Sequence, residues 1–235
     1  MLSIIIPTYN EAENIKPLCE RIFAAVKAAG LDAELIFVDD ESPDGTGSVI
    51  DSLAGRYNIK AVHRKGNRGL ASAVIEGFNA ARGEILCVLD ADLSHPPEKI
   101  PDMYRLIANN ESDFVIASRL VKGGGSTDWS LFRKAISVVA QIIARPLTPI
   151  KDLTSGYFML KRSVIEGVKL NPIGFKIGLE IIAKGHYNRA VEIPIVFSGR
   201  VKKRSKLGAR QTIEYLLQVF GLYLLSFQKK IRGGA

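Results

Sequence analysis

Apolar residues in the first half of the chain follow two different spacings. Continuous apolar runs, typical of strands buried on both faces, alternate with stretches in which apolar residues recur three and four positions apart, as on one helix face. The runs predict strands at residues 3–6, 35–38, 59–62, 85–89 and 114–117. The helical spacing predicts helices at residues 15–26, from the turn at 42–45 to about Tyr57, at 70–81 with Gly83 closing the helix, and after Pro96 and Pro97. This alternation predicts an α/β fold, a mostly parallel sheet with helices on both faces.

The second half of the chain is less regular. It predicts a helix at residues 129–144, strands at 157–160 and 191–197, and a helix near 175–184. Neither an internal repeat nor a linker rich in serine, proline or glycine divides the sequence. We therefore predict a single domain over residues 1–208, followed by a C-terminal appendage over residues 209–235.

The appendage contains one amphipathic stretch. From residue 211 to residue 228 apolar side chains recur at helical spacing, and Glu214 and Gln218 form a narrow polar stripe. A helix over this stretch is roughly 27 Å long, and basic residues flank it on both sides. Three interpretations are open: the helix packs on the core, lies in a membrane interface, or docks on a membrane partner.

The positive charge of the protein is concentrated at the same end. The 235 residues carry 32 Lys and Arg against 24 Asp and Glu, a net charge of +8. Residues 200–235 hold nine of the basic side chains and a single acid, Glu214, so residues 1–199 are neutral overall. A basic end suggests an anionic partner: a phosphate, a nucleic acid or an anionic membrane surface.

Composition excludes several protein classes. Hydrophobic residues make up 47% and charged residues 24% of the chain, values that exclude collagen-like and disordered proteins. Cys19 and Cys87 form no C-x-x-C pair, so we expect a reducing, cytosolic compartment and neither a disulfide scaffold nor a cysteine-based zinc site. We also expect no signal peptide and no membrane-spanning helix, because no apolar run reaches about 20 residues.

Acidic residues gather where predicted strands end. Asp39 and Asp40 follow one strand, and Asp90 and Asp92 follow another. The carboxyl ends of parallel strands share one sheet edge, where ligands of such folds bind. Two carboxylates one residue apart can hold a divalent cation while a diphosphate supplies further oxygens, although aspartate is also a common helix cap. Four carboxylates at one edge repel one another unless a cation or a donor lies among them, which favours a metal site.

Two other kinds of nucleotide site do not fit the sequence. A dinucleotide-binding fold needs G-x-G-x-x-G after its first strand, where this chain has Pro7-Thr8-Tyr9-Asn10-Glu11. The stretch Gly45-Thr46-Gly47 lacks the third glycine, and no P-loop motif occurs. The sheet edge therefore needs another explanation.

Several motifs occur in an order that one enzyme family shares. They are Ile5-Ile6-Pro7-Thr8-Tyr9-Asn10-Glu11, Val38-Asp39-Asp40-Glu41-Ser42-Pro43-Asp44-Gly45-Thr46, Gly69-Leu70-Ala71-Ser72-Ala73, Asp90-Ala91-Asp92-Leu93-Ser94-His95-Pro96-Pro97, Ser118-Arg119, Trp129-Ser130 with Arg133 and Ser137, Asp152 with Ser155-Gly156, and Ser205-Lys206-Leu207-Gly208. From about residue 2 to residue 215 the chain resembles the family 2 glycosyltransferases, and among these the dolichol-phosphate (polyprenol-phosphate) mannosyltransferases. The resemblance implies a GT-A fold.

The resemblance also implies an activity and its site residues. The implied reaction is an inverting transfer of mannose from GDP-mannose to dolichyl or polyprenyl phosphate, with Mg²⁺ or Mn²⁺ as cofactor. By position, the nucleotide pocket takes Pro7, Tyr9, Glu11, Val38 and Asp40. Asp90, Ala91 and Asp92 contact the ribose-diphosphate and the metal. Ser94 stands where some relatives have a glutamine that binds the metal. Arg119, Arg200 and Lys206 hold the diphosphate, and Arg133 and Ser137 receive the acceptor phosphate; Asp92, Arg119, Arg133 and Ser137 are the implied catalytic residues.

The implied chemistry does not need a histidine. A metal with Arg and Lys can stabilise a nucleoside diphosphate as it leaves. The acceptor is already an anionic phosphate, so no strong general base is required. We interpret His95, beside the acidic motif, as a loop residue before Pro96 in preference to a catalytic one.

Other functions remain open. One alternative is a polyprenyl-phosphate glucosyltransferase that uses UDP-glucose, and another is a transferase that builds a polysaccharide. A third is a non-catalytic protein that binds anionic lipid or nucleic acid through its basic end. The leading hypothesis is a peripheral enzyme on the cytoplasmic face of a membrane, with a small membrane subunit as an optional partner and no nucleic acid.

Overall fold

Strands and helices alternate through most of the structure. The computed structural model describes residues 1–66, 68–127, 139, 142–145, 148–170, 176–198 and 216–224. The strands are β1 (Leu2–Thr8), β2 (Ala33–Asp39), β3 (Ile59–His63), β4 (Ile85–Val88), β5 (Phe114–Ser118), β6 (Gly125–Ser126), β7 (Phe158–Lys161), β8 (Ala190–Pro194) and β9 (Val196–Phe197). The helices are α1 (Ala12–Ala28), α2 (Thr46–Ala54), α3 (Leu70–Ala80), α4 (Ile100–Ala108) and α6 (Ile177–Lys184), with 3₁₀ turns η1 (Pro97–Lys99) and η3 (Arg162–Val164).

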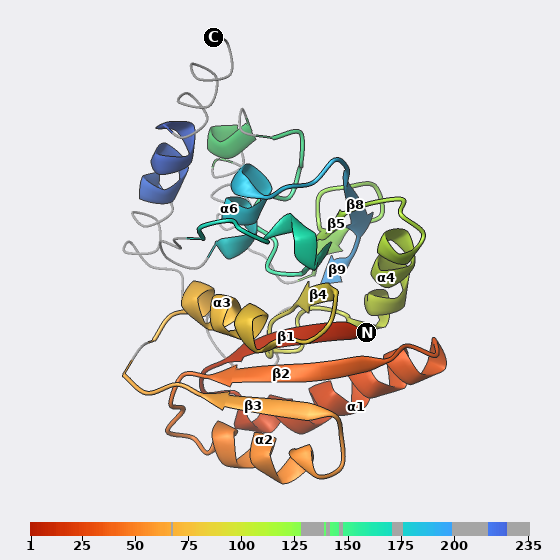
Figure 1. The fold of residues 1–235 in the computed structure, drawn as a ribbon, viewed down its shortest axis with the longest axis vertical. Coiled ribbons are helices and arrows are strands. Elements are labelled where there is room, and N and C mark those ends of the chain that lie inside the picture. Colours follow the sequence, from red (N-terminus) through yellow and green to blue (C-terminus); the bar gives the residue numbers. More distant parts are fainter. Residues whose placement is uncertain are drawn as a thin grey trace.

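Seven strands form one central sheet in the order β3-β2-β1-β4-β7-β5-β8, and β6 pairs with β9 in a small second sheet (Figure 1). Strands β3, β2, β1 and β4 pair with one another in parallel, and so do β5 and β8. Only β7, between β4 and β5, runs antiparallel to both of its neighbours. The predicted α/β fold with a mostly parallel sheet is confirmed.

Each central strand contributes to two hydrophobic cores. In β1, Leu2, Ile4 and Ile6 pack with α1, α2 and α4, whereas Ile5 packs with α3 and α6 on the opposite face. Figure 1 shows α1 and α2 below β1 and α3 above it. At Gly77 of α3 an added Cβ would lie 2.3 Å from Ile5 Cγ2, so this helix approaches β1 as closely as only glycine allows. Burial on both faces explains why β1, β2, β4 and β5 contain continuous apolar runs.

Helix α3 ends differently from the prediction. Its last residue is Ala80, and the backbone is already extended at Ala81. Gly83 does not close the helix; it packs against the start of β1, where an added Cβ would lie 2.7 Å from the Met1 carbonyl oxygen. The guanidinium of Arg162 donates to the Ala81 carbonyl at 2.8 Å and caps the helix instead. A long-range arginine thus performs the role that the sequence assigned to a local glycine.

The single strand predicted at residues 191–197 is two strands. β8 pairs with β5 in the central sheet, and β9 pairs with β6. Between them, the Ile195 amide donates to the Ser118 carbonyl at 3.0 Å and the Ile195 carbonyl accepts from the Gly125 amide at 2.9 Å. The chain therefore changes sheets at Ile195, a change that its apolar pattern does not reveal.

Residues 216–224 form a helix that presents apolar side chains to two environments. Val219 and Leu222 are buried with α6 in one of the cores. Leu217 and Phe220 point away from that core and are 55% and 63% exposed. The predicted division at residue 208 lies outside the described residues, and so does most of the helix predicted at 129–144. Within that predicted helix, residues 142–144 are described and are helical. None of the helices described is long and apolar enough to cross a membrane.

Candidate functional site at the carboxyl edge of the sheet

Parallel pairing brings the ends of several strands to one edge of the sheet. The register places Thr8 of β1 beside Asp39 of β2, and Asp39 beside His63 of β3. Strand β4 flanks β1 on its other side and runs in the same direction. The segments that leave these strands, residues 9–11, 40–46, 64–69 and 89–95, therefore start from the edge at which open α/β sheets bind ligands.

Protein donors already satisfy Asp39. Its Oδ1 accepts hydrogen bonds from Thr8 Oγ1 at 3.1 Å and Ser42 Oγ at 2.6 Å, and its Oδ2 accepts from the Ser42 amide at 3.0 Å. Asp39 is 3% exposed. This carboxylate shapes the turn after β2. Protein donors therefore stabilise part of the negative charge from which the sequence predicted a metal site.

Asp40 is held by the segment that follows β3. Its Oδ1 accepts from Arg64 Nη1 at 2.8 Å, and its Oδ2 accepts from the Gly69 amide at 2.8 Å. Burial raises the pKa of Asp40, and the charge of Asp39 adds to the rise, although the Gly69 amide and Arg64 act in the opposite direction. Asp40 is thus a buried carboxyl group whose ionised form depends on two specific donors.

Tyr9 contacts the same β3–α3 segment. Arg68 Cζ lies 5.0 Å from the centre of the Tyr9 ring, and Arg68 Nη1 donates to Tyr9 Oη at 3.2 Å. A guanidinium over an aromatic face is attracted by the ring quadrupole. The contact links the loop after β1, on which the sequence places nucleotide-binding residues, to the loop after β3.

The other residues predicted for the nucleotide pocket lie along the same edge. Pro7 and Val38 are paired neighbours in β1 and β2, Val38 fully buried and Pro7 half-buried. The Glu11 amide donates to Thr46 Oγ1 at 2.9 Å, and Glu11 Oε2 accepts from Asn14 Nδ2 at 2.7 Å. The first bond joins the start of α1 to the start of α2, and the second lies within the first turn of α1.

The Asp90-Ala91-Asp92 motif forms a tight turn after β4. Asp92 is 5% exposed, and its Oδ1 accepts from the Ser94 amide at 3.0 Å. Leu93, between them, has a φ of 62°, in the left-handed region that non-glycine residues rarely adopt. The Ser94 hydroxyl is buried and has no hydrogen-bond partner among the described residues. The turn therefore holds a carboxylate beside a hydroxyl oxygen whose bonding capacity is unused.

The Asp90 side chain is more open than that of Asp92. It is 29% exposed and faces Gly156, where an added Cβ would lie 3.5 Å from both carboxylate oxygens. Ala91, between the two acids, is buried. No group of three or more His, Cys, Asp or Glu side chains in the described part of the chain could hold a metal by itself.

His95 is a buried structural residue of the motif. Its Nδ1 accepts from the Asp90 amide at 3.1 Å, which places the proton of the neutral ring on Nε2. The ring packs against Tyr157 and the edge of Phe197, with centroids 5.2 and 5.4 Å apart. Burial lowers the pKa of His95, although the charges of Asp90 and Asp92 oppose this. The ring thus anchors the turn, a more definite role than the expected loop residue.

Arg119 and Asp152 form a buried ion pair. Arg119 Nε and Nη2 donate to the two Asp152 carboxylate oxygens at 2.8 and 2.7 Å, and Nη2 also donates to Thr154 Oγ1 at 2.9 Å. Asp152 is fully buried and the Arg119 side chain is 11% exposed. Burial alone would raise the pKa of Asp152, but the hydrogen bonds and charge of Arg119 outweigh it and hold that pKa below its usual value. The guanidinium is therefore fixed in direction at the end of β5.

Four predicted site residues lie outside the described part of the chain. They are Arg133, Ser137, Arg200 and Lys206. The structure thus brings together Pro7, Val38, Asp40 and Tyr9 at one end of the edge and Asp90, Ala91, Asp92 and Ser94 at another turn of it. The predicted roles of all these residues remain predictions.

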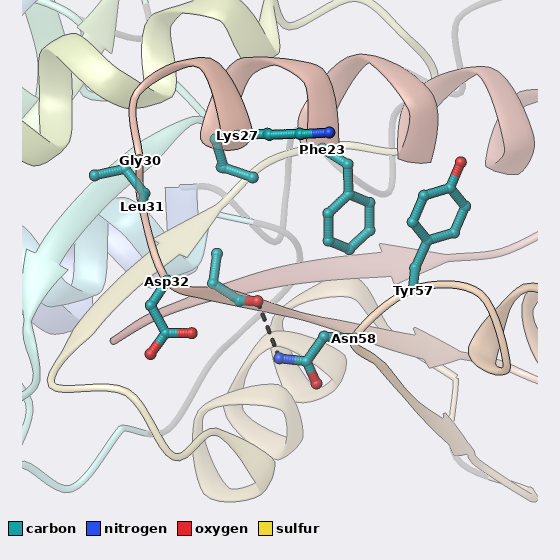
Figure 2. A pocket seen from close by; sticks show the side chains of 9 residues that line it. Phe23, Lys27, Gly30, Leu31, Asp32, Tyr57 and Asn58 are labelled. Atoms are coloured by element: carbon teal, nitrogen blue, oxygen red, sulfur yellow. Dashed lines mark hydrogen bonds between the residues drawn. The ribbon is translucent and has the colours of Figure 1, made fainter.

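A hollow on the described surface lies elsewhere. Figure 2 shows Phe23 and Tyr57 stacked side by side over it, with ring centroids 4.5 Å apart, and Asn58 bonded to the Ala33 carbonyl. The hollow, about 510 Å³, is lined by the end of α1 and the starts of β2 and β3. It therefore opens at the amino ends of the strands, away from the predicted site residues that the structure describes.

Comparison with known proteins identifies the family. The family model described as "Glycosyl transferase family 2" matches residues 3–168. The chain belongs to glycosyl transferase family 2. This family 2 transferase is 46% identical over 225 residues to a dolichol-phosphate mannosyltransferase of Pyrococcus furiosus, covering 94% of this chain and 63% of that relative. It is 40% identical over 236 residues to the dolichol-phosphate mannosyltransferase of Saccharomyces cerevisiae, covering 96% of this chain and 88% of the relative.

A solved structure supports the fold. The mannosyltransferase PcManGT of Pyrobaculum calidifontis, determined with GDP-Man and Mn²⁺, superposes with a TM-score of 0.66 at 22% identity, covering 95% of this chain and 64% of that one. At this identity the likeness concerns the fold alone. The GT-A fold expected for this family 2 transferase is confirmed. The chain spans somewhat less than two thirds of the Pyrococcus relative's length.

Sequence reasoning missed one residue of this family 2 transferase's site, Arg64. Its side chain is 4% exposed and reaches Asp40, yet in the sequence it belongs to a basic stretch that resembles a solvated loop. The available signal was its position: Arg64 directly follows β3, and Asp40 directly follows the neighbouring β2. Residues that follow paired parallel strands become neighbours at the sheet edge.

Proposed function

We propose that this family 2 transferase moves mannose from GDP-mannose to dolichyl or polyprenyl phosphate with inversion at the sugar carbon. The observation that carries the proposal is the turn after β4. There the buried Asp92 carboxylate lies beside the Ser94 hydroxyl, which has no hydrogen-bond partner among the residues that the structure describes. It stands at the same sheet edge as Asp40 and Tyr9, the proposed nucleotide pocket. Relatives that are 46% and 40% identical to this chain over the aligned residues bear the name dolichol-phosphate mannosyltransferase.

The donor set of the turn fits a hard divalent cation. Carboxylate and hydroxyl oxygens are ligands that Mg²⁺ and Mn²⁺ accept, and a buried oxygen without a partner is otherwise costly. Asp92 and Ser94 would hold the ion, and Asp90 would face the ribose-diphosphate across from Gly156. When bound, the ion supplies charge that stabilises the departing diphosphate.

The proposed reaction exchanges one bond at the sugar for another. An oxygen of the acceptor phosphate forms a bond to mannose C1 while the bond from C1 to the β-phosphate oxygen breaks and GDP leaves. Arg119, Arg200 and Lys206 would stabilise the charge on GDP, and Arg133 and Ser137 would hold the acceptor phosphate. Since that phosphate is already an anion, positioning replaces a general base. The rigid Arg119–Asp152 pair fits such a role.

A donor panel tests this proposal. We expect the purified protein to transfer mannose from GDP-mannose to dolichyl phosphate in detergent, only when Mg²⁺ or Mn²⁺ is present, and to release GDP. Mass spectrometry of the lipid product identifies the sugar, and NMR of the anomeric proton reports inversion. A preference for UDP-glucose would favour the glucosyltransferase, and transfer to a hydroxyl acceptor would favour a polysaccharide enzyme. No transfer from any donor would leave only a binding function.

We further propose that the helix at residues 216–224 rests on the cytoplasmic surface of a membrane. Leu216, Leu217, Phe220 and Leu224 are 45–63% exposed along it, and Ile142, from the segment that Tyr223 contacts, is 66% exposed. The basic residues of the flanking sequence favour an anionic surface. Cys19 and Cys87 are free and buried, which fits the reducing side of the membrane.

Vesicle binding tests the membrane proposal. We expect Leu217→Ser and Phe220→Ser to weaken binding to phosphatidylserine-containing vesicles by about tenfold each, because each withdraws roughly 1.5 kcal/mol of apolar burial. Leu222→Ala is the matched control on the buried side of the helix; it should lower the unfolding temperature and leave vesicle binding intact. Sedimentation with vesicles measures both effects. Unchanged binding in the two serine variants would indicate that a small membrane subunit covers this face instead.

A further inference from the structure

Arg64 connects three elements around the proposed nucleotide pocket. Besides its bond to Asp40, Nη1 donates to the Gly69 carbonyl at 3.2 Å, Nη2 donates to Ser72 Oγ at 2.7 Å, and Nε lies 3.0 Å from Glu76 Oε2. The backbone amide of Arg64 also donates to the Asp39 carbonyl at 2.9 Å. One side chain thus joins the end of β2, the β3–α3 loop and the first two turns of α3.

Asp40, Arg64 and Gly69 form a closed ring of hydrogen bonds. Gly69 donates its amide to one Asp40 oxygen and accepts from Arg64 at its carbonyl, and Arg64 donates to the other Asp40 oxygen. Each carboxylate oxygen of Asp40 therefore has one protein donor at a fixed angle. An oxygen of a carboxylate can accept more than one hydrogen bond, so the ring fixes the directions of the remaining lone pairs.

Burial of the Arg64–Asp40 ion pair costs free energy that a contact serving stability alone would not require. Taking a guanidinium and a carboxylate out of water is unfavourable, and a buried ion pair is often no more stable than apolar residues of the same size. The side chains of Arg64 and Asp40 are only 4% and 7% exposed. A buried pair at a ligand-binding edge is better explained by what it does for the ligand.

We propose that Arg64 is the positioning residue of the donor pocket: it keeps the Asp40 carboxylate ionised and aimed at the N–H groups of the donor's nucleobase. The inference rests on the proposed function, since it takes a nucleoside diphosphate sugar as the ligand of this edge. Arg64 also fixes the β3–α3 loop, from which Arg68 reaches Tyr9. Arg64 acts through Asp40 and this loop, and the reacting atoms lie elsewhere.

Electrostatics supports this role. Asp39, the last residue of β2, directly precedes Asp40 in the chain. Arg64 and the Gly69 amide donate to Asp40, and Glu76 of α3 faces Arg64. Burial already raises the pKa of Asp40, and Arg64 is the cation that opposes the rise. Without that cation the carboxyl group takes up a proton more readily, and a protonated carboxyl group loses acceptor capacity for nucleobase N–H groups.

Steady-state kinetics of Arg64→Met and Arg64→Lys test the inference. We expect Arg64→Met to raise KM for GDP-mannose at least tenfold at neutral pH and to change kcat less than threefold. The rise should shrink as the pH increases, because Asp40 then ionises again. Arg64→Lys keeps a cation but lacks the fork of donors, so its KM should lie between those of Arg64→Met and the parent. Circular dichroism establishes that each variant is folded.

Arg82→Met is the matched control. Arg82 pairs with the buried Glu34 at 2.9 Å, but at the amino ends of the strands. It should lower the unfolding temperature and leave KM for GDP-mannose unchanged at every pH. Parent-like KM values in both folded Arg64 variants, or a loss of kcat with KM unchanged, would overturn the inference. If instead the parent itself neither binds GDP in calorimetry nor transfers a sugar, the proposed function fails before Arg64 is in question.

Discussion

The Asp92→Asn variant is expected to lose nearly all transferase activity while remaining folded. Asp92 is 5% exposed and uses Oδ1 to accept from the Ser94 amide, a bond that the asparagine carbonyl oxygen can keep. The substitution removes the charge with little change of shape. If Asp92 holds the divalent cation, we expect kcat to fall roughly 10²–10³-fold, the usual cost of one lost electrostatic stabiliser in a transition state.

Two measurements make this prediction specific. Activity titrated with Mn²⁺ should show no saturable rise in Asp92→Asn, and calorimetry should show that Mn²⁺ no longer strengthens GDP binding. Asp102→Asn is the matched control, because Asp102 is a half-exposed acid of α4 paired with Lys99 and Arg105. Its activity should equal that of the parent. Parent-like Mn²⁺ dependence in Asp92→Asn would remove Asp92 from the metal site.

The sequence predicted the part of the fold that depends on local pattern. Strands β1, β2, β4 and β5 contain continuous apolar runs because helices cover both faces of the sheet, and such runs are visible without a structure. The reversed β7 was predicted as a strand but not as an antiparallel one, because direction depends on the path of the chain and not on which residues are apolar. The change of sheet at Ile195 was missed for the same reason.

The residues of the candidate site likewise divide into those with a local signal in the sequence and those without one. Asp40, Asp90 and Asp92 were found because acids at strand ends are a local signal, and the order of motifs added the family. The pairing of the site residues with other segments was not predicted, because the partners are distant in the sequence. Arg64, which contacts Asp40, follows another strand, and Asp152, quoted only as part of a motif, lies 33 residues after Arg119. His95 was interpreted as a loop residue because its burial depends on Tyr157 and Phe197.

The Arg119→Met variant is expected to lose both stability and activity, and the two losses are separable. Removing the guanidinium leaves Asp152 with a buried, unpaired charge, which typically costs about 3–5 kcal/mol. Asp152 is fully buried, and Arg119 donates to both of its oxygens. Urea titration should therefore show a large fall in the free energy of unfolding at neutral pH.

The loss of stability should depend on pH in a defined direction. In the parent, Arg119 holds the pKa of Asp152 below its value in the unfolded chain, about 3.9. The ion pair therefore contributes stability above that pH and loses the contribution as the pH falls through the lower, folded-state pKa. In Arg119→Met the unpaired, buried carboxyl group has a raised pKa and is protonated on mild acidification. The difference in stability between parent and variant should be largest near pH 7 and smaller near pH 4.

A second substitution separates stability from catalysis. In Arg119→Met/Asp152→Asn the buried charge is gone, so much of the lost free energy of unfolding should return at pH 7. Transfer should stay impaired by roughly 10²-fold, because the cation proposed to stabilise the departing diphosphate is still missing. Urea titration and kcat are measured on the same preparations. If activity returned together with stability, Arg119 would be a structural partner of Asp152 and the diphosphate would depend on other cations.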